Sequence, residues 1–104
     1  MSDANPNGPY TAAKKTSSAV VTTAGVGGYL KAFGMTVTTN ASEIEIRDGG
    51  ASGTVLCDLH LDGATAKNSI SSGDIGPIRF ATDIYMTLTG TGAEGWAVYN
   101  EDSA

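Results

Sequence analysis

Apolar and polar residues alternate along several short stretches of the chain, which predicts β-strands that are buried on one face. The clearest stretch is residues 43–47, where Ile44 and Ile46 would face a core and three charged side chains would face water. The same alternation recurs in residues 29–39, 54–62, 84–89 and 96–99. Clusters of Gly, Asn, Asp and Ser separate these stretches, and none predicts a helix.

Three less regular stretches complete the prediction: residues 16–23, 66–71 and 75–80. Pro77 places the last of these at a sheet edge or a bulge, because proline cannot donate a hydrogen bond to a neighbouring strand. The total of seven or eight strands predicts an all-β antiparallel sandwich with jelly-roll or Greek-key connections. Within it, a loop at residues 48–53 predicts that residues 43–47 and 54–62 form a hairpin.

In residues 96–99 the side chains on both faces are apolar or aromatic, so either face could point into the core. We predict that Trp96 and Val98 point into the core, and that Ala97 and Tyr99 point outward. Tyr85 lies on the polar side of its own stretch, opposite Ile84 and Met86, so it is also expected at the surface.

Residues 1–13 lack periodicity and are rich in Pro, Asn, Gly and Ala. They predict an extended N-terminal arm that precedes a sandwich domain of residues 14–104. Such an arm could lie along a neighbouring subunit, with Tyr10 as an anchor, or could be a disordered tail.

With 104 residues the chain has room for one domain. A domain of this size buries only about two-thirds of the surface that its unfolded chain exposes. The composition, with 14 glycines against one Trp, two Phe and four Tyr, predicts a modest core. Association with a partner would therefore add useful stability.

The formal net charge is −5, which disfavours nucleic acid and anionic membranes as partners. The first residues contain neither a basic nor an apolar segment typical of a secretory signal, so we expect folding in the cytoplasm. Without secretion, the sequon at Asn40 is better interpreted as a turn.

Residues 90–95 match the G-x-G-x-x-G pattern of dinucleotide-binding loops, but a strand-like stretch follows where that motif needs a helix. A hairpin loop is the better interpretation. Asp58, His60 and Asp62 alternate on one strand face and could in principle bind a metal. Same-face residues lie about 6.5–7 Å apart along a strand, however, so we expect a hydrated surface with no metal.

No residue pattern predicts an enzyme. Cys57 lies in a strand without an activating neighbour and is expected to be a small buried side chain. Glu43 and Glu45 would face solvent together, without the contrasting environments that a glycosidase requires. We therefore expect neither a catalytic residue nor a cofactor.

Residues 45–56, followed by the turn at Asp62 and Gly63, resemble the central hairpin of small β-sandwich proteins of phage virions. In those proteins a strand ending in Asp-Gly leads through a short Ser/Gly loop into Gly-Thr and an apolar strand. The turn at residues 22–25, the stretch at residues 84–90 and its partner at residues 96–99 are similar to the same family. The resemblance spans residues 14–100.

This resemblance implies a capsid decoration (cement) protein, or a head or tail accessory subunit, located in the virion. It implies a homotrimer or other cyclic oligomer whose further partner is the major capsid protein or another virion subunit. The alternative is a receptor- or glycan-binding module, which would need an exposed aromatic platform such as Tyr85 with Tyr99. The candidate interface residues are Tyr10, Tyr29, Tyr85 and Tyr99.

Overall fold

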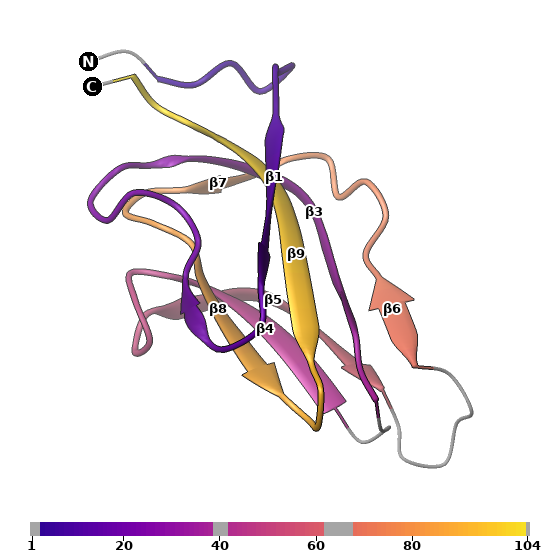
Figure 1. Ribbon diagram of the computed structural model, residues 1–104. Helices are drawn as coiled ribbons and strands as arrows, with labels where there is room; N and C mark the ends of the chain where they lie inside the picture. Colours follow the sequence, from indigo (N-terminus) through magenta and orange to yellow (C-terminus); the bar gives the residue numbers. More distant parts are fainter. Residues whose placement is uncertain (1–2, 39–41, 62–67, 104) are drawn as a thin grey trace.

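The computed structural model describes residues 3–38, 42–61 and 68–103, and this part of the chain forms nine strands and no helix (Figure 1). The strands are β1 (Thr11–Lys15), β2 (Ala19–Val20), β3 (Gly28–Thr36), β4 (Ser42–Asp48), β5 (Thr54–Leu61), β6 (Ser69–Ser71), β7 (Ile78–Phe80), β8 (Tyr85–Thr89) and β9 (Glu94–Glu101). The all-β prediction is confirmed.

Every pairing is antiparallel, and the strands form two sheets. One sheet has the order β1-β9-β3-β6, with β7 also paired to β3; the other has the order β2-β8-β4-β5. The chain crosses repeatedly from one sheet to the other, so strands that are adjacent in sequence are mostly not paired. The predicted hairpin is the exception, because β4 pairs with β5.

The core lies between the two sheets. Its largest fully buried side chains are Leu30, Phe33, Met35, Ile44, Ile46, Phe80, Ile84 and Met86. The sheets approach closely at Gly95, where an added Cβ would lie 2.3 Å from Sδ of Met86. Gly95 on β9 therefore faces β8 and β4 of the opposite sheet, and this contact fixes which face of β9 is internal.

The predicted direction of Trp96 is wrong. Ala97 is fully buried and Tyr99 is 9% exposed, whereas Trp96 and Val98 are only half-buried. Since Gly95 faces the core, alternation sends Trp96 and Val98 to the outer face of the five-stranded sheet. There the indole packs over Gly34 of β3, whose missing side chain leaves room for the ring: a Cβ would lie 2.5 Å from it.

Three smaller expectations also need revision. The predicted arm ends too late, because residues 11–13 belong to β1 and pair with β9. Residues 90–93 are not a hairpin loop, because β8 and β9 lie in different sheets. The strand predicted at residues 16–23 is reduced to the two residues of β2. The turns predicted at Asn40 and at residues 62–63, and Asp62 itself, lie outside the described residues.

Two aspartates hold the β4–β5 and β7–β8 loops together. The carboxylate of Asp48 accepts hydrogen bonds from the backbone N–H groups of Ala81, Thr82 and Asp83. In return, the carboxylate of the buried Asp83 accepts from the N–H groups of Gly49 and Gly50, which have positive φ angles. Burial alone would raise the pKa of Asp48, but these three hydrogen bonds outweigh it and lower the pKa.

Candidate functional site

The outer faces of the two sheets differ in chemistry. On the five-stranded sheet, the register places Ala12, Trp96, Val98, Ala32 and Gly34 beside one another across β1, β9 and β3. This group, which we call the apolar face, is bordered by Lys14 and Glu94, whose side chains form an ion pair of 3.4 Å. Trp96 lies half-buried at the centre of this group.

The outer face of the four-stranded sheet is charged instead. Its register brings Glu43 opposite both His60 and Thr89, and Glu45 opposite both Asp58 and Thr87. Arg47 pairs with Glu45, with 2.7 Å between Nη2 and Oε1. Asp58 and His60 are exposed on this face, whereas Glu43 and Glu45 are half-buried.

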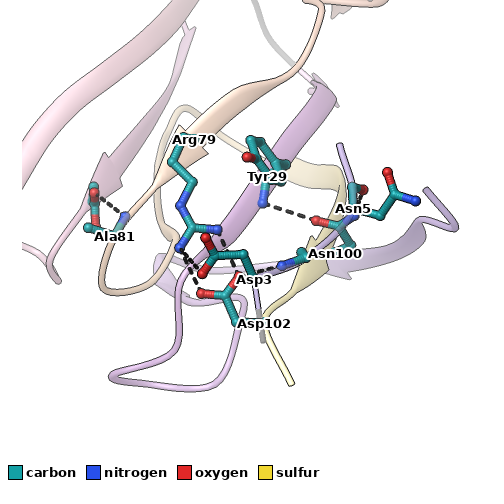
Figure 2. Close-up of polar contacts among 9 residues, drawn as sticks. Asp3, Asn5, Tyr29, Arg79, Ala81, Asn100 and Asp102 are labelled. Atoms are coloured by element: carbon teal, nitrogen blue, oxygen red, sulfur yellow. Dashed lines mark hydrogen bonds and ion pairs between the residues drawn. The ribbon is translucent and has the colours of Figure 1, made fainter. Parts of the chain in front are cut away.

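The segment before β1 is bound to the end of the five-stranded sheet (Figure 2). Arg79 of β7 forms two contacts of 2.7 Å with the carboxylate of Asp102, which also accepts a hydrogen bond from the N–H of Ala4. Asn100 donates its side-chain amide to the carbonyl of Asn5. The Arg79 guanidinium, followed by the Ala4 N–H, lowers the pKa of Asp102. Residues 3–5 thus contact their own domain.

The four tyrosines proposed as interface residues lie in different places. Tyr29 is half-buried on the outer side of β3, and the guanidinium of Arg79 lies 5.3 Å from its ring centroid. Tyr85 belongs to the other sheet, so it cannot form a platform with Tyr99. Tyr99 is largely internal, although it reaches the surface near Tyr10.

Tyr10 and Tyr99 meet at an open hollow of about 300 Å³. Its lining residues are Pro9, Tyr10, Thr11, Tyr99, Asn100 and Glu101. The Nζ of Lys31 lies 5.7 Å from the Tyr10 ring centroid, and the Tyr10 hydroxyl donates a hydrogen bond to the carbonyl of Pro6. Tyr10 and Tyr99 are the aromatic residues among those that line this hollow.

Glu43, Asp58 and His60 form the one group of potential metal ligands found among the described residues. The Nε2 atom of His60 lies 2.8 Å from Oδ2 of Asp58 and 3.2 Å from Oε2 of Glu43. The sequence indicated Asp58 and His60, but not Glu43, because the pairing of β4 with β5 was needed to bring it there. Burial, then the neighbouring carboxylates, raise the pKa of Glu43, although His60 opposes this effect.

Cys57 is half-buried on the inner side of β5 and packs against the core. Burial, and secondarily the charge of Asp58, raise the pKa of its thiol to about 11. The thiol is therefore protonated near neutral pH, and the thiolate needed for nucleophilic attack is scarce.

In comparisons with known proteins, no protein-family model, no curated protein and no solved structure matches this chain. A search of the described residues finds no helix able to cross a membrane.

Proposed function

We propose that this protein is a non-enzymatic structural protein that acts through contacts with other protein subunits. The observation that carries this proposal is the apolar face centred on Trp96, which contrasts with the charged outer face of the other sheet. An outer sheet face whose central side chains are apolar is suited to contact with another protein surface. Trp and Tyr are the side chains that most often dominate the binding energy of such sites.

The specific role that we propose is that of a capsid decoration protein of a phage virion, assembled as a homotrimer or other cyclic oligomer on the major capsid protein. The strand order supports this proposal. The orders β1-β9-β3-β6 and β2-β8-β4-β5 are compatible with a jelly roll, the fold that we propose and that viral capsid proteins use. This part of the proposal rests on the fold and on the resemblance of the central hairpin.

Trp96 provides the test, because it is the only tryptophan in the chain. If the apolar face mediates association, raising the protein concentration is expected to shift Trp96 emission to shorter wavelength and to reduce its quenching by acrylamide, since the indole loses contact with water. The replacement Val98→Ser on the same face is expected to move this transition to higher concentration.

The matched control is Thr87→Ser, on the outer face of the four-stranded sheet, which is expected to leave the transition unchanged. If emission and quenching of the unmodified protein stay constant over the whole range, the apolar face does not mediate self-association. If Thr87→Ser and Val98→Ser shift the transition equally, a surface other than the apolar face mediates self-association.

A second candidate function is glycan or receptor binding, and the hollow between Tyr10 and Tyr99 favours it. The ring of Tyr10 could stack on a sugar at this hollow. The two functions use different surfaces, so the replacement Tyr10→Ala separates them: it should abolish binding to a glycan array and leave the behaviour of Trp96 unaltered.

A further inference from the structure

We propose that Glu43, Asp58 and His60 form a binding site for one divalent transition-metal ion, with Zn²⁺ as the best-suited ion. The site lies on the charged outer face of the four-stranded sheet, whereas the apolar face lies on the five-stranded sheet. The proposed site therefore does not depend on the proposed function.

The three side chains are brought together by two separate features of the fold. Asp58 and His60 are two residues apart on β5, so their side chains point to the same side of the sheet. Glu43 lies directly opposite His60 on β4. Cross-strand partners have Cβ atoms about 4.5–5.5 Å apart, closer than neighbours along one strand. The cross-strand ligand thus removes the spacing problem that made Asp58, His60 and Asp62 an unsuitable set.

The distances suit a small metal ion. Zn²⁺ binds nitrogen and oxygen ligands at about 2.0–2.1 Å, so the ligands of a tetrahedral site lie about 3.3 Å apart. Nε2 of His60 lies 2.8 Å from the Asp58 oxygen and 3.2 Å from the Glu43 oxygen, and all the ligand atoms lie within 4.8 Å of one another. Rotation of these side chains about their own bonds would bring the three ligand atoms to this spacing.

The charges favour a cation as well. Both carboxylates face the same imidazole nitrogen, and Arg47, the nearest guanidinium in the strand register, is instead paired with Glu45. A metal ion would bind the nitrogen lone pair and relieve the repulsion between the two carboxylates. One imidazole with two carboxylates favours zinc or a similar borderline ion over Mg²⁺ and Ca²⁺, which prefer oxygen alone.

Three protein ligands leave coordination positions that water fills, an arrangement typical of open rather than structural zinc sites. The side chain of His60 is 65% exposed and that of Asp58 is 41% exposed, so an ion can enter without movement of the backbone.

The test is calorimetric titration of the full chain with ZnCl₂, near neutral pH and in a buffer that does not bind metal. We expect one Zn²⁺ per chain. The replacements His60→Ala and Glu43→Gln are each expected to weaken binding by roughly tenfold or more, because each removes a ligand. Excess MgCl₂ is expected not to compete.

Two control variants locate the ion. Asp74→Asn removes an exposed carboxylate that pairs with Lys31 elsewhere on the surface, and it is expected to leave the affinity unchanged. Cys57→Ser removes the thiol on the opposite side of β5 and is also expected to bind normally. With Co²⁺, the absorption spectrum should lack the intense near-ultraviolet band that a thiolate ligand produces.

Three results would overturn the proposal. One is the absence of saturable zinc binding, and another is an unchanged affinity in His60→Ala. The third is loss of binding in Cys57→Ser, which would assign the ion to the thiol. Circular dichroism of each variant shows whether the fold is retained.

Discussion

Phe33→Ala is expected to lower the free energy of unfolding by about 3–5 kcal/mol, the range found when a buried aromatic side chain is removed. Phe33 is 1% exposed and lies opposite Ala97 in the middle of the five-stranded sheet. Its small partner cannot fill the resulting cavity. Native domains are stable by only about 5–15 kcal/mol, so this variant should melt at a much lower temperature.

Urea unfolding monitored by Trp96 fluorescence measures this effect. The matched control is Val55→Ala, because Val55 is an apolar side chain on β5 that is 43% exposed. We expect a change of about 0.5 kcal/mol or less for the control. Similar losses in the two variants would mean that Phe33 is not in a close-packed core between the sheets.

Asp48→Ala is expected to lower the free energy of unfolding by about 2 kcal/mol. Three backbone N–H groups lose their charged acceptor, and hydrogen bonds to charged groups are stronger than neutral ones. Because Asp48 and Asp83 hold the same pair of loops, the double variant Asp48→Ala/Asp83→Ala should cost less than the sum of the two single changes. Strict additivity in urea unfolding would contradict this reciprocal arrangement.

The carboxylates of Asp48 and Asp102 also make the stability of the folded protein depend on pH in the acid range. The pKa values of Asp48 and Asp102 are lower in the folded protein than in the unfolded chain, whose aspartates titrate at about 3.9. Their contribution is therefore present above this pH and is lost as pH falls through the folded values. Asp48→Asn should flatten the decline of stability below about pH 4. If the stability of Asp48→Asn declines with pH as that of the unmodified protein does, Asp48 does not contribute to the acid sensitivity.

The fold class could be predicted from the sequence because strands with one polar and one apolar face reveal their period. Ile44 and Ile46 alternate with charged residues, which leaves one possible orientation. Residues 95–99 offered no such contrast, since apolar side chains occupy both faces of β9. The choice there depended on Gly95 and Ala97, whose small size lets the opposite sheet approach. Residue size and long-range packing, rather than hydrophobicity, decided the direction of Trp96.

The candidate sites show the same limit. Alternation on β5 correctly placed Asp58 and His60 on one face, but the third ligand comes from the register between β4 and β5, which periodicity does not fix. Likewise, a glycan-binding module would need a platform such as Tyr85 with Tyr99, and the division of β8 and β9 between two sheets separates these residues. Information about pairing partners is long-range, so it is largely missing from local patterns.

The central claim is that this domain acts by associating with other protein subunits through its apolar face. The most direct test is the solution mass of the unmodified protein, measured by light scattering over a wide range of concentrations. We predict a discrete oligomer, a trimer of about three times the chain mass of 10.5 kDa or another cyclic assembly, that Val98→Ser weakens. The mass of a single chain at every concentration would contradict it.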